Sequence, residues 1–476
     1  MDVLSLSLGS TGLLTAVFVF LSVIYYIFSK KTQENNAPPS CKGWIPWLGC
    51  AFDFGVAPLG FIDKKRRELG PVFTLHVAGE RLTFLTEAED FHHFFQSSNV
   101  DFQRAVQDPV QNIASVSEES FMQYHTKIHD MMKGRLASSR LSDVTPHLIQ
   151  QFKGKIQSIF GDEGEGDLHD LVRKTMYAGV INNLFGDNTL PVDDPKEFEK
   201  ICQHFIVFDE QFEYGARLPP MFIRDWSTAK QYLLSKFRGV VPKLQNEKTQ
   251  GNQTVLQSLV SITDKPHAPN YALMLLWAAL ANAVPITFWA LSMILSNKRV
   301  LEKLQKQVDD TLGNTPEEKW EFNEEFFKKM PYLKSCVMEA IRLHSVGVIT
   351  RRVMTSFTVR EYVIPKGDML MVSPFWSHRN PKYFPEPDTF NPDRWNTSDL
   401  EKNLYLEGFI AFGGGRYQCP GRWYALMELQ MFIALLLFKY KVNALSDHVP
   451  SPSLKHVVGT QQPSKPFLIS YKTKAS

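Results

Sequence analysis

One short stretch near the C-terminus combines the residue types that a cysteine-ligated cofactor needs. The stretch from Phe412 to Gly421 reads FGGGRYQCPG, and the apolar run from Trp423 to Tyr440 that follows it predicts a helix. Backbone N–H groups point outward at a helix N-terminus, so Cys419 should have a lowered pKa and a stabilised thiolate. The glycines let the backbone pass close to a flat partner, because nothing projects from their Cα atoms.

These features leave two interpretations of the stretch. In the functional one, Cys419 is a thiolate held rigidly beneath a planar cofactor, for which haem is the obvious candidate. Pro420 suits this arrangement, because its missing N–H would lack a partner at a helix entry anyway. In the alternative, a glycine-rich turn precedes a core helix and the cysteine only packs.

Composition sets broad limits on the function. The 476 residues are 44% hydrophobic and 21% charged, with a formal net charge of +2, which is ordinary for a globular protein and gives no sign of nucleic-acid binding. The cysteines are scattered and form no Cys-x-x-Cys motif, so neither a zinc site nor a disulfide framework is indicated. They are Cys41, Cys50, Cys202, Cys336 and Cys419. A reducing compartment suits a free thiolate.

An uncharged N-terminal run predicts a membrane anchor. Residues from Leu4 to Phe28 are rich in Leu, Val, Ile, Phe and Tyr, and about 20 apolar residues span a bilayer. Lys30 and Lys31 follow the run, which places its C-terminal side in the cytosol. The alternative is a cleaved signal peptide, but the run is long for one and has no basic residues before it.

A stiff segment follows the predicted anchor. Three prolines restrict the backbone between Gln33 and Gly49, and two tryptophans there can pack against a domain or a membrane surface. The sequence therefore predicts an anchor at residues 1–29, a proline-containing hinge at 30–50 and one large domain at 51–476.

The large domain is predicted to be mainly α-helical with small β-sheets. Residues 71–86 alternate apolar and polar side chains around Ala78-Gly79-Glu80, which predicts a β-hairpin. From about Glu87 to Leu312, apolar residues recur at three- and four-residue spacing, which is typical of helices. No internal repeat interrupts this pattern.

The segment from Asp209 to Trp226 is rich in aromatic residues and prolines beside several charges. One interpretation is a packed loop between two helices. The other is the mouth of a channel that dips into a membrane. The pattern of residues leaves both open.

A second long apolar stretch runs from Tyr271 to Leu295. It could be another membrane span, but it contains Asn282 and Pro285 and lacks an aromatic or basic girdle. A buried central helix is therefore favoured. Pro285 has no backbone N–H, so the carbonyl of Ala281 should lack its helical hydrogen bond and the helix should open there.

Glu339 and Arg342 are three residues apart and share one face of a predicted helix. Such pairs are usually surface ion pairs of little energetic value. A downstream segment that includes Asn391-Pro392-Asp393-Arg394 gives the pair more interest. A family resemblance, given below, relates these two segments to the cysteine stretch.

The cysteine stretch resembles the haem-binding signature of the cytochromes P450, the haem-thiolate monooxygenases. The matching positions are Phe412, Gly415, Cys419 and Gly421. The resemblance implies haem b as cofactor, with Cys419 as the metal ligand and the other three in the cofactor-binding loop. This chain departs from the family at Tyr417, where an arginine or histidine is usual.

Further motifs resemble the same family in the same order. There, a Glu-x-x-Arg pair and a later arginine form a buried network behind the haem, which implies a structural role for Glu339, Arg342 and Arg394 in holding the cysteine loop. The segment from Val346 to Arg352 predicts a strand, and Arg352 falls where the family often contacts a haem propionate. A guanidinium suits that contact because its planar fork pairs with a carboxylate.

The central helix departs from the family. The usual pattern is a small residue, Gly, any residue, an acid and Thr, whereas this chain has Ala-Asn-Ala-Val-Pro at 281–285, with Thr287 two positions on. The usual acid–alcohol proton relay is therefore missing. We expect the Asn282 amide and the carbonyl freed by Pro285 to hold a proton-carrying water. The alternative is that Asn282 makes an ordinary structural hydrogen bond.

The Asn-Ala-Val-Pro pattern resembles the branch of sterol 7α-hydroxylases, sterol 12α-hydroxylase and prostacyclin synthase. Segments 42–47, 212–215 and 373–376 look especially like the oxysterol 7α-hydroxylases within it. This implies hydroxylation of a sterol such as 24-hydroxycholesterol at the endoplasmic reticulum membrane. Because no Gly-x-Gly-x-x-Gly fingerprint is present, electrons would come from a partner. The resemblance implies the NADPH–cytochrome reductase, and Arg422 and Lys439 are candidates for guiding it.

Two rival functions remain open in the sequence. One is a peroxide isomerase of the prostacyclin synthase type, which needs neither O₂ nor a reductase, and the missing acid–alcohol pair is compatible with it. The other is a haem-binding sensor or carrier without turnover.

Overall fold

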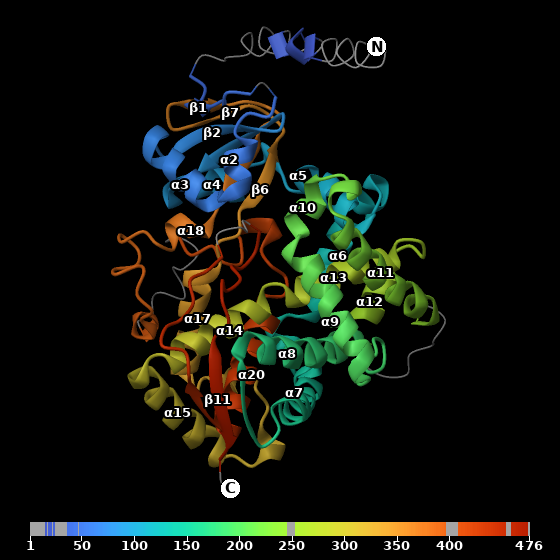
Figure 1. Ribbon diagram of the computed structural model, residues 1–476, viewed down its shortest axis with the longest axis vertical. Coiled ribbons are helices and arrows are strands. Elements are labelled where there is room, and N and C mark those ends of the chain that lie inside the picture. The colour runs from blue at the N-terminus through green and yellow to red at the C-terminus, as the bar shows by residue number, and fades with distance from the viewer. Residues whose placement is uncertain are drawn as a thin grey trace, which may run out of the picture. The chain divides into compact units, whose positions relative to one another are not determined.

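The computed structural model describes residues 15–16, 18–20, 22–23, 36–45, 47–244, 253–396, 408–453 and 458–474. The predicted anchor at residues 1–29 lies almost entirely outside the described residues. By contacts, the chain divides into two compact units, one made of Met1–Ala105 with Ile349–Val372 and the other of Val106–Val348 with Ser373–Ser476. Figure 1 labels the elements of both.

The first unit is built on a six-stranded sheet with strand order β1-β2-β3-β9-β6-β4. The predicted hairpin is confirmed, because β2 and β3 pair antiparallel and turn at Ala78 and Gly79, both with positive φ. Strand β6 confirms the strand predicted before Arg352. The strands are β1 (Ser40–Cys41), β2 (Val72–Val77), β3 (Glu80–Leu85), β4 (Val100–Asp101), β6 (Ile349–Val353) and β9 (Met369–Val372), with a separate hairpin of β7 (Phe357–Val359) and β8 (Tyr362–Ile364).

Short helices cover this sheet, among them α2 (Ala51–Val56), α3 (Pro58–Leu69) and α4 (Phe91–Phe95). The end of the proline-containing segment is part of the same sheet, since β1 pairs parallel with β2. This brings two cysteines together that the scattered spacing gave no reason to pair. The Sγ atoms of Cys41 and Cys50 are 3.1 Å apart, and both thiols are free.

The second unit is mainly helical, as predicted. Its described helices are α6 (Glu118–Arg135), α7 (Thr145–Phe160), α8 (Leu168–Phe185), α9 (Pro195–Glu210), α10 (Phe212–Arg217), α11 (Arg224–Leu244), α12 (Val255–Ile262), α13 (Ala268–Leu280), α14 (Ala283–Leu295), α15 (Lys298–Gly313), α16 (Glu324–Phe327), α17 (Pro331–His344), α18 (Pro374–Ser377) and α20 (Arg422–Lys439), and α5 (Gln103–Ala114) leads in from the first unit. A small antiparallel sheet joins β10 (Tyr440–Ala444), β11 (Leu468–Thr473) and β5 (Glu163–Asp167).

Helices α13 and α14 form the centre of this unit. Together they span Ala268–Leu295, the one stretch of the described residues that is long and apolar enough to cross a membrane, and 78% of its most apolar window is buried. Helix α14 packs against α8, α17 and α20, as Figure 1 shows. The favoured prediction of a buried central helix is therefore confirmed. Each large apolar side chain buried here stabilises the fold by roughly 1.5–3 kcal/mol.

The aromatic segment from Asp209 to Trp226 forms short helical turns rather than a loop. Helix α10 and a 3₁₀ turn at Pro220–Phe222 connect α9 to α11. Trp226 is buried, and a Cβ added to Gly215 would lie 2.2 Å from its ring, so only glycine fits at that position. Other side chains of the segment are exposed, namely Tyr214, Leu218, Met221 and Phe222.

Candidate active site

The cysteine loop folds back on itself before α20. The N–H of Cys419 donates to the carbonyl of Phe412 at 2.8 Å, which places the two ends of the motif side by side. Gly413 and Gly415 have φ of 68° and 64°, a region that favours glycine. A 3₁₀ turn at Gly415–Tyr417 completes the loop. The glycines therefore serve the turn geometry that brings Cys419 to the start of the helix.

The sulfur of Cys419 has the surroundings expected for a ligand, but its pKa differs from the prediction. Burial raises the pKa of the Cys419 thiol above its ordinary value, while hydrogen bonds from the backbone N–H groups of Gly421 and Arg422, and the charge of Arg422, act to lower it. The predicted lowering was thus wrong in net direction, since desolvation outweighs the donors in the free thiol. The donors themselves are those expected at a helix start.

The structure brings Glu339, Arg342 and Arg394 together. Arg342 donates to both carboxylate oxygens of Glu339 at 2.8 Å, and Arg394 donates to Oε1 at 2.9 Å. Trp395 Nε1 and the backbone N–H of Asn391 also donate to Glu339, at 2.9 and 3.0 Å. Because Glu339 and Arg342 are fully buried, these bonds replace the water that both charges lose.

His378 connects this network to the segment that enters the cysteine loop. Arg342 donates to the carbonyl of His378 at 2.7 Å, and Nδ1 of His378 lies 3.0 Å from the carbonyl of Arg342. The other ring nitrogen accepts the N–H of Ile410 at 3.1 Å, and the ring stacks on Phe409. Sequence reasoning missed His378, because its partners are more than 30 residues away in each direction and no motif marks it.

The central helix opens where Pro285 predicts. Helix α13 ends at Leu280 and α14 begins at Ala283. Asn282 is exposed between buried neighbours, and its Oδ1 accepts a hydrogen bond from Thr460 at 3.2 Å. A Cβ on Gly459 would lie 2.6 Å from the same Oδ1. The C-terminal loop therefore lies directly against the helix opening.

Gly459 also meets a second glycine. A Cβ added to Gly347 would lie 2.5 Å from the backbone nitrogen of Gly459, and Gly459 itself has φ of 78°. The backbones at Gly347 and Gly459 and the side chain of Asn282 are thus in close contact, with no room for an added Cβ at either glycine. We call this contact the join of Gly347, Gly459 and Asn282.

Arg352 lies in the first unit, on β6. Its Nη1 donates to Glu80 and to the carbonyl of Gly367, each at 2.9 Å. Its neighbour Arg351 is buried between the rings of Phe94 and Phe102. The role of Arg352 toward a haem propionate stays a prediction.

Comparisons with known proteins agree with this arrangement. The cytochrome P450 family model matches residues 38–471. The chain belongs to the cytochrome P450 family. It is 40% identical over 96% of its length to 24-hydroxycholesterol 7-alpha-hydroxylase of Homo sapiens, covering 98% of that protein. For the protein of the same name from Mus musculus, identity is 39% over 97% of this chain and 98% of that protein. A cholesterol 7-alpha-monooxygenase of Cricetulus griseus is 24% identical, with 95% and 96% covered.

Family membership makes the protein a monooxygenase that carries haem on a cysteine thiolate. The residues around Cys419 fit that ligand. Two backbone N–H groups already point at its sulfur, and a metal-bound thiolate is stabilised by such donors. The other cysteines with a raised thiol pKa, namely Cys50, Cys202 and Cys336, owe it chiefly to burial.

Proposed function

We propose that this cytochrome P450 hydroxylates a sterol, and that its reaction is the 7α-hydroxylation of an oxysterol such as 24-hydroxycholesterol, a step of cholesterol catabolism toward bile acids. The observation that carries the proposal is similarity to proteins of that activity along almost the whole chain. The rigid loop around Cys419 supports the monooxygenase chemistry that such a reaction needs.

Cys419 would hold the haem iron, with Phe412, Gly415 and Gly421 shaping the loop. When bound, haem supplies the activation of O₂ and the insertion of one oxygen atom into a C–H bond. The network of Glu339, Arg342 and Arg394 holds the loop in place. Asn282 and the carbonyl freed by Pro285 hold the water that carries protons.

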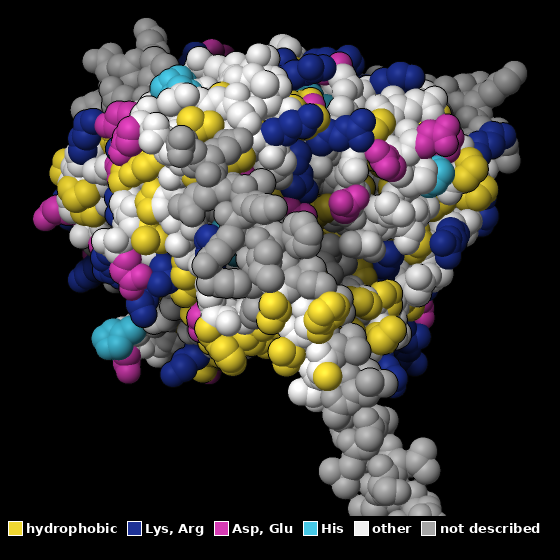
Figure 2. Space-filling model, turned by 90° about the horizontal axis from the view of Figure 1, so that it is seen from above, with side chains coloured by type: hydrophobic (Ala, Val, Ile, Leu, Met, Phe, Trp, Pro, Cys, Tyr) yellow, Lys and Arg dark blue, Asp and Glu magenta, His cyan; other side chains and the backbone are white. Residues whose placement is uncertain are grey.

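The protein is proposed to act at the endoplasmic reticulum membrane, with a single N-terminal anchor and the catalytic domain in the cytosol. Figure 2 shows hydrophobic side chains gathered in patches between Lys and Arg on the face that it draws. In the second unit, Tyr214, Leu218, Met221 and Phe222 of α10 and the turn after it are exposed apolar side chains close together in the chain. They support membrane contact in addition to the anchor.

Electrons are proposed to come from the NADPH–cytochrome reductase. Arg422, at the start of α20, stacks over Trp423 with its guanidinium 4.9 Å from the ring centroid. Lys439, at the other end of the helix, bonds to Gln157. Of the two, Arg422 lies beside the cysteine loop, where a cation would attract an acidic partner surface, whereas Lys439 is a whole helix length away.

The test incubates membranes carrying the chain with reductase, NADPH and a panel of sterols, and identifies products by mass. A hydroxylated oxysterol that forms only with NADPH supports the proposal. A rearranged peroxide formed without NADPH would instead establish an isomerase, which the missing acid–alcohol pair at 281–285 would suit. A spin-state change with no product from any sterol would indicate a sensor.

A further inference from the structure

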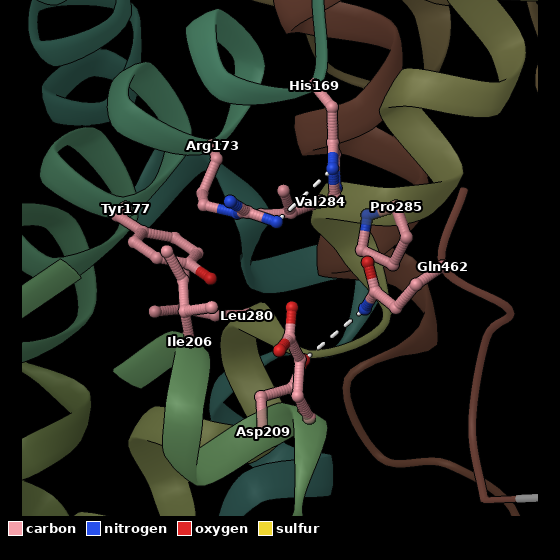
Figure 3. A pocket seen from close by; sticks show the side chains of 10 residues that line it. His169, Arg173, Tyr177, Ile206, Asp209, Leu280, Val284, Pro285 and Gln462 are labelled. Atoms are coloured by element: carbon pink, nitrogen blue, oxygen red, sulfur yellow. Dashed lines mark hydrogen bonds between the residues drawn. The ribbon is translucent and has the colours of Figure 1, made fainter. Parts of the chain in front are cut away.

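A pocket with polar walls lies directly beside the opening in the central helix. Figure 3 shows its side chains converging from α8, α9, α13, α14 and the C-terminal loop. On the helix side it is lined by Leu280, Val284 and Pro285, and on the other sides by His169, Arg173, Tyr177, Ile206, Asp209, Glu210 and Gln462. The pocket therefore joins the helix opening to a cluster of titratable groups that the proposed reaction does not yet use.

Asp209 is the acid of this pocket. Its Oδ1 accepts a hydrogen bond from Trp277 Nε1 at 2.9 Å, and its Oδ2 accepts one from Gln462 Nε2 at 3.3 Å. Burial raises the pKa of Asp209 from 3.8 to about 7, whereas the bond from Trp277 and the charge of Arg173 act to lower it. The carboxyl thus exchanges its proton near neutral pH, as a group that relays protons must.

The pocket also contains a buried polar atom that needs a partner. Arg173 lies 3.2 Å from Nδ1 of His169 and can only donate, so Nδ1 accepts and Nε2 carries the hydrogen. His169 is 7% exposed, and its Nε2 has no hydrogen-bond partner among the described residues. Burial lowers the pKa of His169 to about 3, so the ring is neutral. A water in the pocket would satisfy such an atom.

Two connections lead from Asp209 to the helix opening. Pro285 lines the pocket and cannot donate to the carbonyl of Ala281, so that carbonyl lacks its helical donor one turn before the pocket wall. Gln462, which bonds to Asp209, is two residues from Thr460, which bonds to Asn282. The C-terminal loop therefore bonds to both Asp209 and Asn282, and Pro285 both lines the pocket and opens the helix.

We propose that Asp209 is the proton-holding group of this enzyme and that it replaces the acid of the missing acid–alcohol pair, acting through water in the pocket. The inference rests on the proposed monooxygenase function. Asp209 gives the proton on its carboxyl to a pocket water, and that water passes one of its own protons to the water held by the carbonyl of Ala281 and Asn282. The resulting carboxylate regains a proton from solvent past the exposed Glu210, so protons balance in each cycle.

Several charged and titratable groups face Asp209 and set its behaviour. Arg173, with the neutral His169 and Tyr177, faces it from α8, and Glu210 and Glu213 raise its pKa by their charge. The Trp277 indole from α13 and the Gln462 amide complete the surroundings. Among these groups, Trp277 offers a means of moving the pKa of Asp209 without removing the acid.

The first test compares Asp209→Asn with Glu199→Gln, a matched loss of one carboxylate on the same helix at an exposed position outside the pocket. Haem content and sterol binding are measured first, and coupling, the product formed per NADPH consumed, is then followed across pH. We expect Asp209→Asn to lower coupling about tenfold or more, with NADPH diverted to hydrogen peroxide. Glu199→Gln should change it little, and Asp209→Glu should restore most of it. Equal coupling in Asp209→Asn and the unmodified chain would overturn the proposal.

The second test uses Trp277→Phe, which keeps the aromatic ring stacked on Phe212 and removes the N–H donor. The carboxyl of Asp209 is titrated by infrared difference spectroscopy, a readout that requires no turnover. Because the Trp277 bond lowers the pKa, the variant should titrate at higher pH, and coupling should persist to the same higher pH. An infrared shift without a shift in the coupling profile would overturn the proposal even if Asp209→Asn does not fold. A chain that makes no product with any sterol would contradict the proposed function instead, and the infrared titration would still decide whether Asp209 holds a proton near neutral pH.

Discussion

Glu339 and Asp209 are both carboxylates among the helices of the second unit, but their surroundings differ. Glu339 accepts hydrogen bonds on both oxygens from two arginines, an indole and a backbone N–H. Asp209 accepts one hydrogen bond on each oxygen, both from neutral groups, and lies beside a histidine nitrogen that has no partner within the described part of the chain. A fully paired charge is held in position by its partners. A partly paired one can change its proton state, which is what proton transfer needs.

Substitution of Cys419, whose loop the network of Glu339, Arg342 and Arg394 is proposed to hold, should have the largest effect on haem binding. Cys419→Ser is expected to abolish the carbon-monoxide difference band of a thiolate-ligated haem, because a hydroxyl does not replace the thiolate. Visible spectroscopy of the reduced protein checks this. Alanine at Cys202 or Cys336 is the control and should leave the band intact, whereas a retained band in Cys419→Ser would assign the ligand to another cysteine.

Breaking the network of Glu339, Arg342 and Arg394 should reduce haem binding nearly as much. Arg342→Ala leaves the buried Glu339 without its main partner, at a cost of about 3–5 kcal/mol, and removes the bond to the carbonyl of His378. We expect haem-free or aggregated protein, measured as the ratio of haem to protein after purification. Arg299→Ala, which breaks an exposed pair with Asp393, should cost less than about 1 kcal/mol. A haem-loaded Arg342→Ala with normal stability would contradict the structural role.

The partly paired carboxyl of Asp209 should make the free energy of unfolding depend on pH. The pKa of Asp209 in the fold, about 7, lies above its ordinary 3.8, so the stability it contributes is fully present below about pH 4 and is lost as pH rises through 7. Relative to the unmodified chain, Asp209→Asn should therefore become more stable as pH rises from 4 to 7, by about 2 kcal/mol once solvent around the part-exposed side chain is considered. Urea unfolding across this range measures the difference. A constant offset at every pH would mean that Asp209 is ionised throughout.

The smallest effect on stability is expected at Asn282, which makes a structural hydrogen bond and is also proposed to hold the proton-carrying water. Asn282→Ala removes a hydrogen bond of roughly 1 kcal/mol and should keep haem and sterol binding but divert NADPH to hydrogen peroxide. Thr460→Val removes the same bond and leaves the Asn282 amide in place, so it separates the two roles. Equal loss of coupling in both variants would make the bond structural, and lost sterol binding at intact haem content would make Asn282 a substrate contact.

Local chemistry explains what the sequence could predict. The loop before α20, the hairpin at Ala78 and Gly79, and the helix opening at Pro285 all depend on residues a few positions apart, so their spacing carries the information. The grouping of Glu339, Arg342 and Arg394 was accessible only through the family resemblance, because Arg394 is 52 residues from Arg342 in the chain.

The remaining features depend on packing between distant segments. The hydrogen-bond partners of Asp209 are Trp277 and Gln462, which lie 68 and 253 residues away in the chain. Nothing near Asp209 in the sequence indicates that its pKa would be raised. The predicted pKa direction of Cys419 failed for a related reason. The helix start was visible in the sequence, but the extent of burial that opposes it was not.

The join of Gly347, Gly459 and Asn282 has a practical consequence for engineering. A library that varies the C-terminal loop freely will contain many members with a side chain at position 459, and each will push that loop away from the helix opening, whatever else it carries. Holding both glycines constant while varying the positions around them would confine the search to proteins in which the loop still meets Asn282. A smaller residue at 282 would not rescue a side chain at 459, because the φ of 78° there favours glycine whatever the space.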